Sequence, residues 1–130
     1  MPVGSHVVRL DHVNLCVPED GVAAETKWLV DVLGYRGVEP GPDASKFGTL
    51  YWFEAEDGTQ VHLTVDPEHR PSGRAHTAVH LGDALDDVLA RVAATTGQAP
   101  GGGLTFDGGR HVFATDPAGN LWELIGPPVS

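Results

Sequence analysis

Three histidines and one glutamate stand out in this sequence because imidazole nitrogens and carboxylate oxygens together bind divalent transition metals. His12 lies in the run LDHVNLCV, and His76 lies in the similar run AHTAVHLGD. His62 and Glu123 each follow a turn that ends in glycine, at Gly58 and Gly119 respectively. When the two halves of the chain are superimposed, His12 falls on His76 and His62 falls on Glu123. The repeat therefore predicts one metal site built from two equivalent positions per half.

Each half contains the same order of elements around these residues. A strand-like run that contains His12 or starts at His76 precedes an apolar stripe at helical spacing, at residues 22–33 and 85–93. Gly34 and Gly97 follow as stop signals. Further strand-like runs occupy residues 48–55 and 59–65, then 104–106, 110–115 and 120–125. We expect one α+β domain over residues 1–130, with βαβββ modules at about 8–66 and 75–127.

Alternation along the strands separates an apolar face from a mixed face, because successive side chains point to opposite sides. The apolar face predicts packing under the helices. The mixed face carries the four candidate ligands and predicts a cavity between the modules. On this face His80, Asn14 and Gln60 are candidate substrate contacts, and Arg110 is a candidate for an anionic group. His69 and His111 are expected in loops or at edges, and Cys16 is expected to be a packed residue.

The composition excludes several partners. The 130 residues carry a formal net charge of −10, which argues against nucleic acid and anionic membrane surfaces. No stretch reaches the length of a membrane span, and the first ten residues lack the apolar region of a signal peptide. A single cysteine excludes an intrachain disulfide and fits a cytoplasmic location.

The chain resembles the vicinal oxygen chelate superfamily, which includes glyoxalase I, methylmalonyl-CoA epimerase, extradiol dioxygenases, fosfomycin resistance enzymes and bleomycin-binding proteins. The resemblance covers about residues 8–127. It depends on LDHVNLCV, on Val32-Leu33-Gly34-Tyr35, on GTQVHL, on AHTAVHLGD and on RHVFATDPAGNLWELIGP. It implies a cup-shaped mixed sheet and a homodimer, sometimes with exchanged modules. It also implies that His12, His62, His76 and Glu123 are the metal ligands.

Four such ligands would suit one divalent ion of zinc, nickel, cobalt, manganese or iron. A six-coordinate ion would keep two open positions for a small substrate with adjacent oxygens, such as a 2-oxo or 2-hydroxy carbonyl compound. The ion would act as a Lewis acid on an enediolate formed by proton abstraction, with Glu123 as the proton shuttle. We therefore expect a glyoxalase-type lyase or isomerase.

Two other functions stay open. One is a drug- or metabolite-binding resistance protein that uses the same cup without turnover. The other is an Fe(II) extradiol dioxygenase, which needs three open positions on two histidines and a carboxylate. Ligation by His62 would occupy one of those positions. Glyoxalase I commonly has glutamate where this chain has His62, so a glutathione adduct is not an expected substrate.

Overall fold

The structure is a computed structural model that describes residues 4, 6–47, 49–100, 103–105 and 108–128. Its first module contains β1 (His12–Val17), α1 (Val22–Lys27), the π-helical turn η1 (Trp28–Leu33), β2 (Arg36–Val38), the 3₁₀ turn η2 (Ala44–Phe47), β3 (Thr49–Glu54) and β4 (Gln60–Val65). The second contains β5 (His76–His80), the 3₁₀ turn η3 (Gly82–Ala84), α2 (Leu85–Thr96), β6 (Leu104–Thr105), β7 (Gly109–Thr115) and β8 (Leu121–Pro128).

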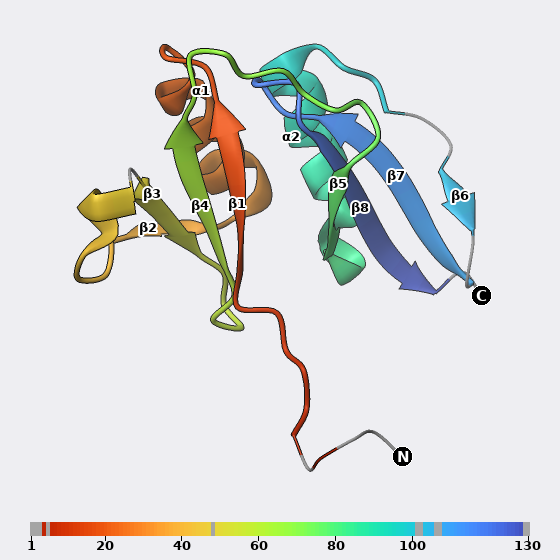
Figure 1. Cartoon of the computed structure of the whole chain (residues 1–130). Coiled ribbons are helices and arrows are strands. Elements are labelled where there is room, and N and C mark those ends of the chain that lie inside the picture. The colour runs from red at the N-terminus through yellow and green to blue at the C-terminus, as the bar shows by residue number, and fades with distance from the viewer. Residues whose placement is uncertain (1–3, 5, 48, 101–102, 106–107, 129–130) are drawn as a thin grey trace.

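The two modules have the same sheet topology. One sheet has the strand order β1-β4-β3-β2, and the other has β5-β8-β7-β6. The first and last strands of each module are parallel neighbours, and the other pairs are antiparallel. In Figure 1 the sheets stand side by side with β1 and β5 as the adjacent edges. The repeated βαβββ order and the α+β class predicted from the sequence are confirmed.

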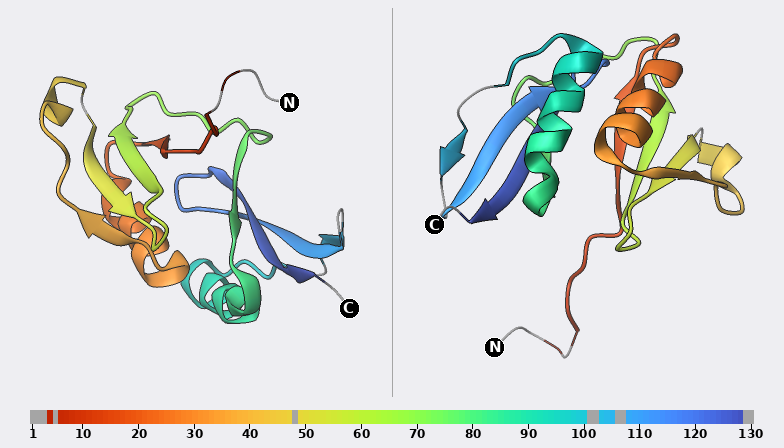
Figure 2. Two further views of the ribbon diagram at one scale, coloured as in Figure 1. Left: turned by 90° about the horizontal axis from the view of Figure 1, so that it is seen from below. Right: turned by 180° about the vertical axis from the view of Figure 1, so that it is seen from behind.

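The helices form one layer behind the two sheets. Figure 2 shows α2 beside α1 and η1 on the same side of the molecule. The apolar strand faces pack against them, as alternation predicts, and the core includes Val17, Leu63, Val88 and Leu124. Trp28 and Trp122 are fully buried with ring centroids 6.3 Å apart, so the core continues from one module into the other.

Polar contacts also join the modules. The Asn120 side-chain amide donates to the Cys16 carbonyl at 3.0 Å, and the Arg91 Nε donates to the Val32 carbonyl at 3.1 Å. His69 lies in the segment that links β4 to β5. Its Nε2 donates to the Ala118 carbonyl at 3.0 Å, so this hydrogen bond connects the linking segment to the β7–β8 turn. None of the helices in the described residues is long and apolar enough to cross a membrane.

Some elements differ from the sequence-based expectation. The predicted helix over residues 22–33 changes from α to π hydrogen bonding at Trp28, and Trp28, Leu29 and Val32 lie in the core. The short strand β2 was not located, since three residues are too few to show alternation. Two predicted strand residues, Gly48 and Phe106, lie outside the described residues.

Candidate metal site

The registers of the sheets place the candidate ligands in pairs. In the first sheet Asn14 lies opposite His62, and His12 lies opposite Gln60, so both histidines are on the mixed face of neighbouring strands. In the second sheet Ala78 lies opposite Glu123, which puts His76 on the same face as Glu123. Each module therefore brings its own two candidates together.

His12 is half exposed and its ring orientation is set by Asp11. Its Nδ1 donates to the Asp11 carboxylate at 2.7 Å, and this hydrogen bond holds the pKa of Asp11 below its usual value. With the hydrogen on Nδ1, the Nε2 of the neutral ring keeps its lone pair. A carboxylate on the other nitrogen is the common support of metal-bound histidines.

His62 is buried in a stack of three rings. It lies parallel to His12 with centroids 4.1 Å apart, and parallel to Trp52 on its other face, also at 4.1 Å. Its Nε2 is 2.8 Å from the Gln60 side-chain oxygen. Burial lowers the pKa of His62, and the nearby His12 lowers it further, which favours the neutral ring.

His76 and Glu123 form the corresponding pair in the second module. The His76 Nδ1 donates to the Arg74 backbone carbonyl at 2.9 Å, so Nε2 is the nitrogen that would bind a metal after losing any hydrogen that it shares with Glu123. That Nε2 lies 3.0 Å from the Glu123 Oε1. His76 also contacts the edge of the Phe113 ring, with centroids 5.5 Å apart.

His111 is a member of this group that the sequence analysis placed wrongly. It was expected in a loop or at an edge, but it is buried on β7, with its Nδ1 bonded to the Glu123 Oε2. The residue lies in the predicted strand-like run 110–115, and β7 pairs with β8 there after a register shift between Gly109 and His111. The pattern of His111 and Phe113 on one face, with Val112 and Ala114 on the other, was the signal that could have found it.

The four predicted substrate contacts lie in different places. Asn14 accepts a hydrogen bond from Thr64, and Gln60 bonds His62 and Glu54. Asn14 and His76 line a cleft of about 510 Å³ between the modules, while His80 lines a second cleft of about 530 Å³ on the same seam. Arg110 is paired with Asp86 in the first turn of α2, at 2.8 Å.

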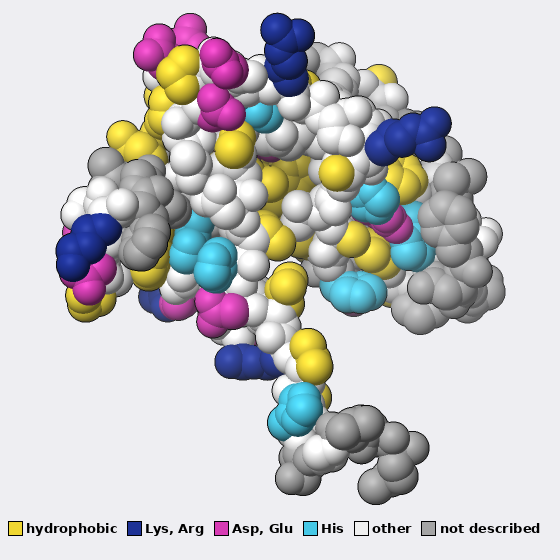
Figure 3. All heavy atoms as spheres, in the orientation of Figure 1, with side chains coloured by type: hydrophobic (Ala, Val, Ile, Leu, Met, Phe, Trp, Pro, Cys, Tyr) yellow, Lys and Arg dark blue, Asp and Glu magenta, His cyan; other side chains and the backbone are white. Residues whose placement is uncertain are grey.

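The structure does not bring all four candidate ligands together. Among the residues that it describes, no three histidine, cysteine, aspartate or glutamate side chains form a group that could hold a metal. Figure 3 shows histidine side chains gathered in separate places over the first and the second sheet, with the hollow between the modules separating them. A single copy of the chain therefore presents two separate pairs of candidate ligands.

The pair in the second module has a spacing that would suit an ion, and the same spacing is also that of a hydrogen-bonded ion pair. Two ligands about 2.1 Å from one ion and at right angles to each other lie about 3.0 Å apart. The His76 Nε2 and the Glu123 Oε1 have this separation. His12 presents the same nitrogen with the same kind of support on Nδ1. These donors can bind zinc, nickel, cobalt, manganese or iron, and their types alone do not identify the metal.

Sequence comparison identifies the family. Residues 9–124 match the Glyoxalase/Bleomycin resistance protein/Dioxygenase superfamily, and the chain belongs to it. The resemblance found in the sequence is thereby confirmed. No curated protein matches the chain in sequence.

Solved structures show the same fold. A glyoxalase family protein from Bacillus anthracis is 19% identical, with a TM-score of 0.77 over 95% of this chain and 98% of that one. A glyoxalase/dioxygenase from Nostoc punctiforme is 22% identical, with a TM-score of 0.71 over 98% and 99%. The fosfomycin resistance protein FosX from Listeria monocytogenes is 16% identical, with a TM-score of 0.70 over 96% and 95%.

Proposed function

We propose that this protein is a metal-dependent enzyme that acts on a small oxygenated molecule at a site shared by two copies of the chain. The supporting observation is the His76–Glu123 pair, whose nitrogen and oxygen are spaced like neighbouring ligands of one ion. His12 has the matching free nitrogen but belongs to the other pair of candidate ligands. A homodimer in which the first module of one copy faces the second module of its partner would join His12 to His76 and Glu123.

The reaction that this site supports best is of the glyoxalase type, an isomerase or lyase reaction on a 2-oxo or 2-hydroxy carbonyl compound. The bound ion would supply Lewis acidity toward the substrate oxygens. Glu123 is the carboxylate that would accept a proton from the carbon next to a carbonyl, after its Oε1 has left the ion. His111 holds the Glu123 Oε2, so Oε1 is directed toward His76 and the open side of the sheet.

Shared sites are tested by mixing two inactive variants. If each site needs one His12 and one His76, a dimer of His12→Ala alone or of His76→Ala alone contains no complete metal site. In a mixed dimer with shared sites, the copy with intact His12 and the copy with intact His76 rebuild one of the two sites. Random exchange of subunits should then restore about a quarter of the wild-type zinc binding. No recovery after exchange, with both parent proteins folded, would place the whole site within one chain.

Turnover is tested separately with the metal-loaded protein. Consumption of a 2-oxo aldehyde or racemisation of an epimerisable 2-oxo acid supports the enzyme, and both should be lost with Glu123→Gln. A ligand that binds in the cleft and leaves unchanged would support a binding protein instead.

An Fe(II) dioxygenase is the second candidate, because His62 is already engaged by Gln60 and Trp52. If His62 stays there, two histidines and one carboxylate remain, with three positions for a bidentate catechol and O₂. Oxygen uptake with catechols after anaerobic loading with iron would favour this function, and its absence would exclude it.

A further inference from the structure

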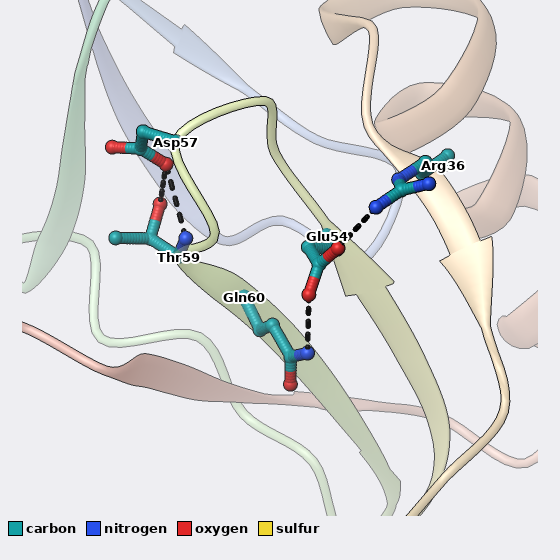
Figure 4. Close-up of polar contacts among 5 residues, drawn as sticks. All are labelled: Arg36, Glu54, Asp57, Thr59 and Gln60. Carbon is teal, nitrogen blue, oxygen red and sulfur yellow. Dashed lines mark hydrogen bonds and ion pairs between the residues drawn. The ribbon is translucent and has the colours of Figure 1, made fainter.

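A relay of hydrogen bonds reaches His62 from the far edge of the first sheet. Arg36 on β2 bonds the Glu54 Oε2 on β3, and the Gln60 Nε2 on β4 donates to the Glu54 Oε1 at 3.0 Å (Figure 4). Arg36 lies directly opposite Glu54, and Glu54 lies directly opposite Gln60, so the strand register itself builds the relay. The neighbouring hairpin is fixed by Asp57, which accepts hydrogen bonds from the Thr59 backbone and hydroxyl (Figure 4).

The relay leaves only one arrangement of hydrogens. A carboxylate only accepts, so Gln60 must turn its amino group to Glu54 and its oxygen to His62. An amide oxygen also only accepts, so the His62 Nε2 must carry a hydrogen. The Arg36 guanidinium keeps Glu54 in place as the acceptor that sets this direction.

The ring stack adds a geometric restriction. A metal bound by imidazole lies in the plane of the ring, about 2.1 Å from the nitrogen. The planes of His12 and His62 are only 15° from parallel, with centroids 4.1 Å apart. One ion cannot lie in both planes. Trp52 on the other side of His62, with planes 2° apart, keeps the ring from tilting.

We infer that the Arg36–Glu54–Gln60 relay fixes His62 with its hydrogen on Nε2, and that the stacking of His62 between Trp52 and His12 keeps it outside the coordination shell of an ion bound by His12, as a support that orients His12. His62 is then a positioning residue, and the ion proposed above keeps three open positions. This inference assumes the proposed metal site. It goes further by removing His62 from the predicted ligand set and by assigning a role to Arg36, Glu54 and Gln60.

Zinc affinity, measured by competition with a chelator, tests the inference. His62→Phe preserves a flat ring between Trp52 and His12, so its zinc affinity should stay within about threefold of the wild type. His62→Ala loses the stack and should weaken binding by about 3- to 10-fold. His12→Phe should weaken it by more than about 100-fold, beyond the range of supporting residues. Equal losses for His62→Phe and His12→Phe would overturn the inference.

Long-range ¹H–¹⁵N spectra give a readout independent of affinity. The His62 nitrogens should show the hydrogen on Nε2 and should not shift on adding zinc, whereas the Nε2 of His12 and His76 should shift. Glu54→Gln keeps the shape of the relay, but a glutamine at this position can donate as well as accept. Gln60 is then no longer forced to turn its oxygen to His62, so both His62 tautomers should appear. Thr64→Val, on the same sheet face, serves as the control. A zinc-dependent shift of a His62 nitrogen equal to that of His12 would contradict the inference, while no shift at any histidine would refute the proposed metal site itself.

Discussion

The two carboxylate oxygens of Glu123 have different neighbours. Oε1 faces the His76 Nε2, and Oε2 is held by the buried His111. A carboxylate held in this way can bind an ion through one oxygen without rotating toward it. If Glu123 binds a metal as proposed, we expect His111 to contribute to metal affinity without touching the metal.

At this scale we predict different effects for two substitutions of His111. His111→Leu should reduce zinc affinity by about tenfold or more, because the Glu123 carboxylate loses its support. His111→Asn keeps a donor near the position of Nδ1 and should recover most of that affinity. Competition with a chelator measures both, with Thr115→Val on the same strand as the control. Equal losses for leucine and asparagine would indicate a packing effect alone.

Sequence reasoning placed the four candidate ligands on the correct strand faces, because each lies in a run with clear alternation. It did not predict that His111 would be buried beside Glu123, because that contact depends on the pairing of β7 with β8. It also could not show that His62 would be stacked and bonded to Gln60. That arrangement depends on the register between β2, β3 and β4, which period-two patterns do not determine.

At the scale of elements, α1 meets the β7–β8 turn through two buried acids. Glu25 on α1 is fully buried. Burial, together with the adjacent Asp116 carboxyl, raises the pKa of Glu25 to about 10. Asp116 itself accepts hydrogen bonds from the turn backbone at Ala118 and Asn120 and from the Trp122 indole. Glu25 is therefore protonated where the modules meet.

This buried acid predicts a pH dependence of stability. The pKa of Glu25 is higher in the folded state, so its contribution is fully present below about pH 4.5 and is lost as the pH rises toward 10. Glutamine does not titrate, so Glu25→Gln removes this loss. The difference in unfolding free energy between the variant and the wild type should shift in favour of the variant by up to about 1.4 kcal/mol for each pH unit in that range. Urea unfolding between pH 5 and 9 measures the gap. Glu19→Gln, at an exposed site, should show no such gap.

Alanine substitutions at two glycines would separate the cost of backbone strain from the cost of steric contact with a neighbouring side chain. Gly34 and Gly119 both have positive φ, at 96° and 84°. A Cβ at Gly34 would meet nothing within 4 Å, but at Gly119 it would lie 2.9 Å from the Pro71 Cγ in the linking segment. Gly34→Ala should cost about 1–2 kcal/mol of unfolding free energy from backbone strain alone. Gly119→Ala should cost more, and equal costs in thermal unfolding would show that the link moves aside freely.

At the scale of the whole molecule, the sequence predicted two modules but not how they complete a site. The repeat is equally compatible with modules that face each other within a chain or between chains, since each ligand pair is formed by parallel neighbours inside one module. The large-scale arrangement depends on the helix layer and on the contacts of Trp28 with Trp122. Neither follows from the position of the histidines.

A site shared between copies links metal binding to assembly. Zinc should favour the dimer, because the ion binds completed sites and not the separate pairs of candidate ligands. Sedimentation of the protein over a dilution series should show a lower dimer dissociation constant with zinc than with a chelator. His76→Ala should abolish the difference. A dissociation constant unaffected by zinc in the wild type would argue against the shared site.

The positions of β1 and β5 at the edges of their sheets have a consequence for solubility. Each ends its sheet in the described part of the chain, and an open edge offers unpaired backbone groups to any extended segment. The stretch before β1 adds Val7 and Val8, which are about nine-tenths exposed. If the proposed dimer covers these edges, a copy kept from pairing would present apolar side chains next to an open edge, and aggregation by strand addition should follow. Lysine in place of Val7 and Val8 would counter this tendency without touching the candidate ligands.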